Sequence, residues 1–285
     1  MRRSIPRLLP MLLLFATFSG CGSGAVKDGP PRSGSTSIPE LPDDAVPRRE
    51  PRSKYGNGPV YEVLGRRYTV MRSSSGYKER GVASWYGKKF HGNLTSNREP
   101  YDMYAMTAAH KALPLPSYVR VRNLRNNKSV IVRVNDRGPF VHNRIIDLSY
   151  SAALKLDMVK DGTSLVEVEA ISFDPPSGDR PTSQTTAAPE PRPDPPATPR
   201  TVNAAVAENR IFVQVGAFGS RDNAEQRLGQ LRSKGIGISF ILEDTSSDPT
   251  LYRVRIGPIK GVVQYDIIVE ELENLGITDP YLVTE

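Results

Sequence analysis

Two proline-rich stretches limit how this chain of 285 residues can fold. They cover residues 22–59 and 174–200 and hold 16 of the chain's 25 prolines, together with many Ser, Thr and Gly. Neither stretch has helical or strand periodicity, and neither can bury enough apolar surface to offset the entropy lost on ordering. We therefore predict two long disordered linkers, 21–59 and 173–209, which separate two small folded domains, 60–172 and 210–285.

The first 21 residues have the pattern of a secretion signal. Arginines at positions 2, 3 and 7 precede an apolar run over residues 8–18, which is too short to span a bilayer comfortably. Ser19 and Gly20 then lead into Cys21, the single cysteine, and this order resembles a bacterial lipobox. The resemblance implies a signal peptide 1–20 and a mature chain anchored through lipids on Cys21 to the periplasmic face of the outer membrane. An ordinary signal peptide followed by a stray cysteine is the alternative.

Residues 60–172 indicate a domain of many short strands. Residues 118–122 alternate apolar and basic side chains, Asn126 and Asn127 mark a turn, and residues 129–134 return as a second strand. Turn residues at 135–139 end that strand, and a short helix capped by Ser149 follows. Many strands with little helix favour a closed β-barrel.

Charge differs between the two predicted domains. Residues 81–173 hold 13 Lys and Arg against 8 Asp and Glu, a net charge of +5, whereas residues 210–285 hold 8 against 11, a net charge of −3. A basic surface suits an anionic polymer, either nucleic acid or peptidoglycan with its lactyl carboxylates. A mixed solvated surface explains the same numbers.

The order of motifs in the middle domain resembles the rare lipoprotein A family. The motifs that carry the resemblance are Ala83–Gly87, Tyr101–Lys111, Val132–Pro139 and Arg144–Ser149. The resemblance implies a double-psi β-barrel and a septal lytic transglycosylase. Such an enzyme acts on peptidoglycan strands that lack stem peptides and leaves 1,6-anhydro ends. No cofactor is implied.

Cutting a glycosidic bond requires a proton donor to the leaving oxygen and stabilisation of an oxocarbenium-like charge. In a lytic transglycosylase the 6-hydroxyl of N-acetylmuramic acid attacks its own anomeric carbon. One carboxyl group then serves twice, as acid for the leaving oxygen and as base for the hydroxyl. Such a carboxyl needs a raised pKa, from burial or from a second acid nearby.

Three residues are the candidates for this chemistry. Asp136 follows an apolar strand and matches the family's proposed catalytic aspartate, although an Asx turn is the simpler explanation. Glu99 matches an acidic family position, but Arg98 stands where the family usually has glycine. We expect this cation to lower the pKa of Glu99 and to leave it an electrostatic or orienting role. By resemblance His110 lines the site; a buried structural histidine is the alternative.

Three aromatic residues, Trp85, Tyr86 and Tyr101, are candidates for stacking on sugar rings in a groove, with core packing as the alternative. The histidines have no metal-ligand spacing, and we predict no metal. Motifs for serine hydrolysis and nucleotide binding are absent from the sequence.

The C-terminal domain has the order β-α-β-β-α-β. Ser220 and Gly235 bound the first helical pattern, and residues 263–272 form the second. The runs Phe212–Phe218 and Tyr252–Pro258 resemble the SPOR domain, a small α+β, ferredoxin-like module that binds bare glycan at division sites. RNA-recognition domains share this topology, but they stack bases on aromatics of the central strands. Here the third strand offers arginines and the domain is acidic, so we predict no nucleic acid partner.

Period-2 alternation divides the C-terminal strands into two faces. The face away from the helices is predicted to carry the glycan-binding side chains, Gln214, Leu251, Arg253, Arg255 and Leu282.

The sequence supports a second function as well. A scaffold that binds bare septal glycan through an expansin-like barrel without cutting it fits the same motifs, and Arg98 leaves room for it. Formation of 1,6-anhydro ends distinguishes the two functions. In either case we expect a monomer.

Overall fold

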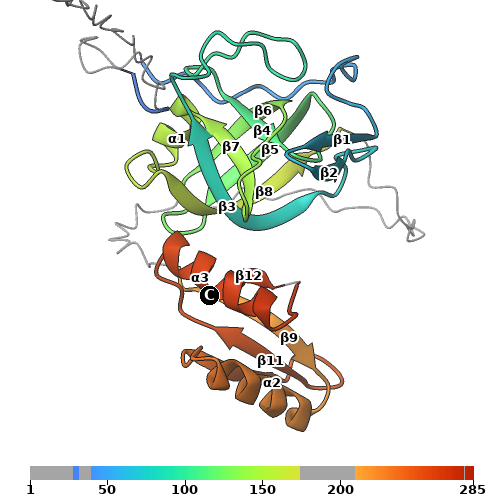
Figure 1. Ribbon diagram of the computed structural model, residues 1–285, viewed down its shortest axis with the longest axis vertical. Coiled ribbons are helices and arrows are strands. Elements are labelled where there is room, and N and C mark those ends of the chain that lie inside the picture. Colours follow the sequence, from blue (N-terminus) through green and yellow to red (C-terminus); the bar gives the residue numbers. More distant parts are fainter. Residues whose placement is uncertain (1–27, 32–39, 174–208, 279) are drawn as a thin grey trace, which may run out of the picture.

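The structure is a computed structural model that describes residues 28–31, 40–173, 209–278 and 280–285. The predicted signal peptide, Cys21 and nearly all of the second linker lie outside the described residues. Figure 1 shows a β-barrel and, beneath it, a smaller domain of helices and strands. No helix among the described residues is long and apolar enough to cross a membrane.

Six strands form the closed barrel, in the order β3-β7-β4-β6-β5-β8. Their bounds are β3 (Lys78–Tyr86), β4 (Thr107–His110), β5 (Ser117–Asn123), β6 (Ser129–Asp136), β7 (Arg144–Ser149) and β8 (Thr163–Ile171). Two pairs, β3–β7 and β4–β6, are parallel, and the other neighbours are antiparallel. The predicted barrel class is confirmed.

Alternating apolar residues fill the inside of the barrel. Val119 and Val121 of β5 are fully buried, while Arg120 between these two valines is exposed. Val132 and Val134 of β6 are fully buried as well. Because successive side chains of a strand point to opposite faces, the valines turn inward together. The short helix α1 (Tyr150–Lys155) begins at the predicted cap, where Ser149 accepts a hydrogen bond from the backbone of Ala152.

The chain before the barrel is packed against it, which corrects the expected linker boundary at residue 59. The backbone N–H of Ala45 donates to Ile131 at 3.0 Å, and that of Ser53 donates to Leu115 at 2.8 Å. The Asn57 side chain also donates to the Leu115 carbonyl at 2.7 Å. Residues 40–59 are therefore held to the barrel by hydrogen bonds to its strands and loops.

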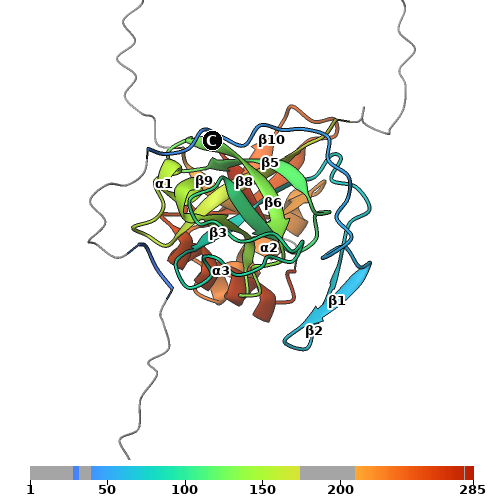
Figure 2. The same cartoon turned by 90° about the horizontal axis from the view of Figure 1, so that it is seen from above.

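The first two strands form a separate hairpin. β1 (Val60–Val63) and β2 (Arg66–Thr69) pair only with each other, and the barrel itself begins at Lys78. Seen from above, this hairpin stands at the side of the barrel (Figure 2). The hairpin is therefore attached to the barrel and contributes no strand to it.

The C-terminal domain is a four-stranded antiparallel sheet with the predicted β-α-β-β-α-β order. The sheet order is β10-β11-β9-β12. The elements are β9 (Ile211–Phe218), α2 (Arg221–Ser233), β10 (Ser239–Asp244), β11 (Leu251–Ile256), α3 (Val262–Asn274) and β12 (Tyr281–Thr284). Ser220 precedes α2 as expected, but its side chain makes no capping hydrogen bond.

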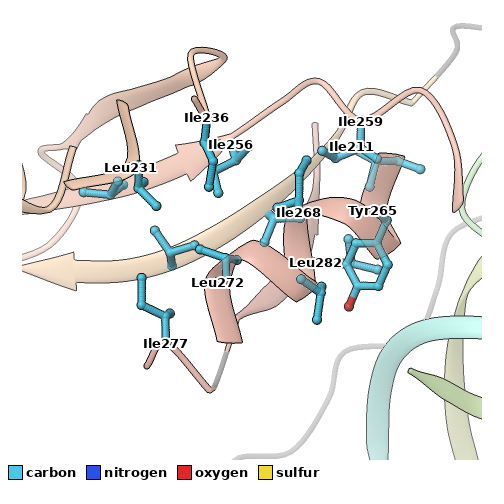
Figure 3. Close-up of a cluster of buried hydrophobic side chains, with 14 of the residues drawn as sticks. Ile211, Leu231, Ile236, Ile256, Ile259, Tyr265, Ile268, Leu272, Ile277 and Leu282 are labelled. Carbon is cyan, nitrogen blue, oxygen red and sulfur yellow. The ribbon is translucent and has the colours of Figure 1, made fainter. Parts of the chain in front are cut away.

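Both helices contribute to one apolar core on one side of this sheet. Leu231 of α2 and Leu272 of α3 are fully buried in one cluster with Val213, Val254 and Ile256 of the strands. Figure 3 shows Leu231, Leu272 and Ile256 in this cluster. The opposite face of the sheet is thereby left to the polar residues that alternate with these three.

Leu282 does not lie on the polar face. Its register partner in β9 is Val213, and directly opposed residues of an antiparallel pair point to the same face. Leu282 is 2% exposed and belongs to the core cluster beneath the helices (Figure 3). The prediction for Leu282 was wrong because alternation along four residues does not set the phase of an edge strand; pairing with β9 sets it.

The two domains contact each other. The two terminal guanidinium nitrogens of Arg144 in β7 each donate to one carboxylate oxygen of Asp266 in α3 at 3.1 Å, and the Asn143 amide donates to the same carboxylate. Val82 and Leu165 of the barrel are fully buried in the same cluster as the core of the C-terminal domain. Polar pairs from β7 to α3 and apolar burial at β3 and β8 together join the domains.

Candidate functional site

A short loop, residues 94–100, is fastened to the end of β6 by two carboxylates. Within the loop, Leu94 bridges to Pro100 and the backbone N–H of Thr95 donates to Glu99 at 2.8 Å. Asp136 and Glu99, the two predicted acids, make the attachments. The structure thus brings both of them to one end of the barrel.

Asp136 is fixed through one of its oxygens. Its Oδ1 accepts from the backbone N–H of Ser96 at 2.8 Å, from the Ser96 hydroxyl at 2.6 Å and from the backbone N–H of Arg137 at 2.7 Å. Asp136 also lines a cavity. Three donors on Oδ1 fix the orientation of the carboxylate at the edge of this cavity. An Asx turn accounts for the bond from Arg137, but not for the two bonds from Ser96 in a distant loop.

Glu99 is held by an arginine fork. Arg133 donates to its two oxygens at 2.6 and 2.9 Å, and the Asn135 amide donates at 2.9 Å. Burial raises the pKa of Glu99, but the bonds from Arg133 and Asn135 outweigh it and the pKa is lowered. The pKa of Glu99 is lowered as predicted, but the cation that lowers it is Arg133 and not Arg98.

A second glutamate shares this arginine. Arg133 also donates to Glu50 at 2.7 Å, from the segment packed before the barrel, and the pKa of Glu50 is lowered to about 2, mainly by this bond. Glu50 was not predicted from the sequence, because it falls in a proline-rich stretch. Arg133 therefore forms ion pairs with two carboxylates from distant parts of the chain.

His110 is buried, with 3% of its surface exposed. Its Nδ1 accepts from the backbone N–H groups of Ala112 and Leu113 at 3.0 and 2.9 Å, so the proton resides on Nε2, 2.8 Å from the Tyr77 hydroxyl. Burial, with Arg137 and Lys111 nearby, lowers its pKa to about 3. The ring is neutral and positions the loop after β4, and in this arrangement it does not border the cavity beside Asp136.

Asp147 of β7 is a further acid of this site, and the sequence pattern did not predict it. Ala109 of β4 is the register partner of both Asp136 and Asp147, so the two acids flank it. Two inter-strand spacings put their backbones roughly 10 Å apart. Burial raises the pKa of Asp147, which accepts a hydrogen bond from the Ser84 hydroxyl, and Asp136 adds a small rise. The signal in the sequence was one acid inside the apolar run 145–148.

None of the three predicted groove aromatics, Trp85, Tyr86 and Tyr101, lines the cavity of about 470 Å³ that borders Asp136. Tyr86 and Tyr101 are 8% and 3% exposed and stack on each other with ring centroids 4.1 Å apart. Trp85 is half-buried and packs against Tyr150 at 5.6 Å. For Tyr86 and Tyr101 the core-packing alternative is therefore the one the structure supports.

The cavity beside Asp136 has a volume of about 470 Å³. It lies between the β1–β2 hairpin, the 94–98 part of the loop, and the residues that follow β6. Its lining residues are Gly56, Gly58, Tyr61, Val63, Leu94, Thr95, Ser96, Arg98, Asp136, Arg137 and Phe140. In the described part of the chain, no group of three or more His, Cys, Asp and Glu side chains is placed to hold a metal ion.

The polar face of the C-terminal sheet carries a linked set of side chains. Gln214 and Arg255 are register partners, 1% and 9% exposed, and the guanidinium donates to the amide oxygen at 3.1 Å. Gln214 also bonds to Tyr281, and Arg255 to Glu285. This set brings together two of the predicted glycan-binding residues.

Arg253 and Leu251 lie on the same face. Arg253 pairs with Leu242 of β10 and donates to Asp244 at 2.8 Å, and its side chain is 25% exposed. Leu251 is half-buried and pairs with Asp244. Four of the five predicted residues therefore share this face, and Leu282 does not.

Comparisons with known proteins match both domains. A family model described as lytic transglycolase matches residues 78–168, and the SPOR domain model matches residues 207–284.

Three relatives are each named endolytic peptidoglycan transglycosylase RlpA. The protein from Vibrio cholerae serotype O1 is 48% identical over 185 residues, 64% of this chain and 70% of that protein. The protein from Pseudomonas aeruginosa UCBPP-PA14 is 39% identical over 276 residues, 84% of this chain and 80% of that protein. The one from Neisseria meningitidis serogroup A is 42% identical over 224 residues, 75% and 79% of the two chains.

Proposed function

Because this chain belongs to the RlpA family, we propose that it is a lytic transglycosylase that cuts the glycan strands of peptidoglycan, with Asp136 as the reacting carboxyl. One observation carries the assignment to Asp136. Its carboxylate is fixed by three donors on Oδ1 and borders a cavity large enough for a sugar unit. A reacting group must be held within hydrogen-bond reach of its target, and this fixation supplies that.

The reaction needs proton transfer in two directions at one place. Asp136 protonates the 4-oxygen that leaves and then takes the proton of the muramic 6-hydroxyl, which closes the 1,6-anhydro ring. Since no water attacks, one carboxyl is sufficient. The oxocarbenium-like charge that develops is stabilised by carboxylates at the same end of the barrel, of which Glu99 is the one held ionised by Arg133.

Asp147 is the second carboxyl that this site offers. Its raised pKa suits a proton donor at neutral pH, and Ala109 between it and Asp136 contributes only a methyl group. Asp136 is favoured because it borders the cavity, whereas Asp147 is not among the cavity's lining residues. Within this proposal Asp147 tunes the site electrostatically through its neighbour.

The other parts of the chain serve delivery. We assign glycan binding to the polar face of the C-terminal sheet, with Gln214, Leu251, Arg253 and Arg255, and the preferred ligand is strands without stem peptides at the division septum. The lipid anchor belongs to Cys21 at the periplasmic face of the outer membrane.

The test is product formation by residues 22–285. The protein is incubated with peptidoglycan from which an amidase has removed the stem peptides, and 1,6-anhydro ends are sought by mass spectrometry. Asp136→Asn, Asp147→Asn and Glu99→Gln are assayed in parallel, with Asp157→Asn as the matched control. Asp157 is an exposed acid in a left-handed conformation that asparagine tolerates.

We expect product from the unchanged protein and from Asp157→Asn, and a loss of about 10²- to 10⁴-fold for Asp136→Asn, the usual share of general acid–base catalysis. Full activity of Asp136→Asn with an inactive Asp147→Asn would move the reaction to Asp147. Binding of bare glycan without product from any form would leave the non-catalytic scaffold as the function.

A further inference from the structure

The cavity beside Asp136 has an aromatic wall that the barrel alone does not supply. Tyr61 and Tyr68 of the β1–β2 hairpin stack with ring centroids 5.3 Å apart, and Phe140 packs against Tyr68 at 5.4 Å. The Tyr61 hydroxyl donates to the Lys111 carbonyl at 2.8 Å, which fixes the ring. The guanidinium carbon of Arg137 lies 5.8 Å from the ring centre of Tyr61, so this ring is held between Tyr68 and Arg137. Aromatic side chains of fixed position are common in the walls of ligand pockets, where they supply apolar area.

Two arginines line this cavity, and one of them is fully engaged. The guanidinium of Arg137 donates to the carbonyls of Gly56, His110 and Leu113 and to the side chain of Asn57, at 2.6 to 3.2 Å. Its donors are directed at the protein. Arg137 therefore braces the cavity and is not available to a ligand.

Arg98 is the other arginine of the lining, and it is exposed. Its guanidinium carbon lies 5.5 Å from the ring centre of Tyr55. Within the described residues its side chain makes no hydrogen bond or ion pair that would occupy the fork. A planar guanidinium with open donors is suited to a carboxylate, which it binds through two parallel bonds.

The backbone of Arg98 has a conformation that is unusual for an arginine. Its φ is 72°, in the left-handed region that glycine adopts without steric cost and that strains an arginine. The loop thus keeps the glycine conformation and carries a cation at some conformational cost, which points to a function for the side chain.

The substrate has one group that matches such a cation. The sugar rings of peptidoglycan glycan are neutral, and the lactyl group of N-acetylmuramic acid joins the stem peptide as an amide. When the stem peptide is removed, that amide becomes a free carboxylate. A positive side chain at the cavity therefore distinguishes a bare muramic residue from a peptide-bearing one by charge.

We propose that Arg98 binds the free lactyl carboxylate of N-acetylmuramic acid in the cavity beside Asp136, with the Tyr61 and Phe140 wall against the sugar. The proposal rests on the proposed function and adds a determinant of selectivity for bare glycan in the barrel itself. Residues 56–63 of the cavity lie before the segment matched by the lytic transglycolase model, so this subsite is built partly from outside it.

The first experiment observes Arg98 directly in residues 22–285 carrying Asp136→Asn, which is expected to suppress cutting during the titration. The Nε–H signal of Arg98, assigned by its loss in Arg98→Gly, is followed by NMR during titration with a tetrasaccharide of alternating N-acetylglucosamine and N-acetylmuramic acid. One sample keeps the lactyl carboxylates free, and the other has them converted to methylamides. Because the readout is one side chain of the barrel, glycan bound to the C-terminal domain does not contribute.

We expect the Arg98 signal to shift with the free carboxylate and to stay in place with the methylamide. Equal shifts with both sugars, or a shift with neither, would overturn the proposal. These outcomes do not depend on whether the chain cuts glycan, so a failure of the proposed function is recognised separately, by the absence of 1,6-anhydro ends.

The second experiment compares cutting by the unchanged chain, Arg98→Gly and Arg120→Ala. Glycine fits the left-handed backbone, and Arg120 is an exposed arginine of β5 that does not line the cavity. We expect Arg98→Gly to lower kcat/KM on strands with free carboxylates by about 3- to 10-fold, as for a partly exposed charge-assisted pair, with no loss on methylamide strands. Equal losses on both substrates would indicate a merely structural role and contradict the proposal.

Discussion

The barrel and the C-terminal domain assemble their polar sites in different ways. In the C-terminal domain the linked set Gln214 and Arg255 lies on adjacent strands of one sheet face, as period-2 alternation requires. In the barrel, Arg133 joins Glu99 and Glu50, which are 34 and 83 residues away along the chain. A face of an open sheet can thus be deduced strand by strand, whereas the barrel site exists only once loops and a preceding segment have closed over the strand ends.

The two regions also differ in what they bury. The barrel encloses a neutral histidine and a carboxyl with raised pKa, His110 and Asp147. The C-terminal sheet buries Gln214 and Arg255 in bonds to each other and to Tyr281 and Glu285. The barrel is therefore expected to respond to acid through groups that must change charge on unfolding, and the C-terminal domain much less so.

The largest expected effect is the acid sensitivity of the barrel. Burial lowers the pKa of His110 to about 3, while in the unfolded chain it is about 6.5. Between these values the unfolded chain binds the extra proton, so the free energy of unfolding falls as pH falls, by about 5 kcal/mol in total. Residues 210–285 contain no histidine and lack this response.

Thermal unfolding between pH 7 and pH 4 checks this difference. The single tryptophan, Trp85, reports the barrel by fluorescence, and circular dichroism reports both domains. His110→Gln is expected to be less stable at pH 7 but to lose less stability on acidification. If the variant and the unchanged chain had the same pH slope, His110 would not be the group responsible. Protonation of Asp147 acts in the opposite direction, because its pKa is raised in the folded state.

A smaller effect separates core from ligand face in the C-terminal domain. Leu282→Ala removes a side chain that is 2% exposed beneath the helices, and we expect it to lower the free energy of unfolding of this domain by about 2 to 3 kcal/mol. Below its own unfolding temperature the variant should bind bare glycan as the unchanged chain does. Calorimetry and a glycan pull-down measure the two quantities. Unchanged stability with lost binding would return Leu282 to the polar face.

The smallest expected effect is on glycan affinity. Arg253→Ala removes a partly exposed arginine paired with Asp244, and we expect binding of bare glycan to weaken by about 3- to 10-fold without a change in the unfolding temperature of the barrel. Arg221→Ala, an exposed arginine of α2 on the helix side, is the matched control. Equal weakening by both variants would mean that only net charge matters and that the sheet face has no specific role.

Local patterns of the sequence determined a large part of this protein. Alternation in residues 118–134 predicted the β5–β6 hairpin, and Ser149 marked the start of α1. Alternation in Leu251–Ile256 also placed Arg253 and Arg255 on one face, because successive side chains of a strand point to opposite faces. Gln214 shares this face through its pairing with Arg255.

Tertiary structure decided what depends on register, closure and burial. The face of Leu282 follows from its pairing with Val213, and the lowered pKa of Glu99 follows from Arg133 on a strand 34 residues later. The packing of residues 40–59 and the raised pKa of Asp147 likewise need the closed barrel. These features depend on which distant residues meet and how much water they exclude, and local periodicity carries no information about either.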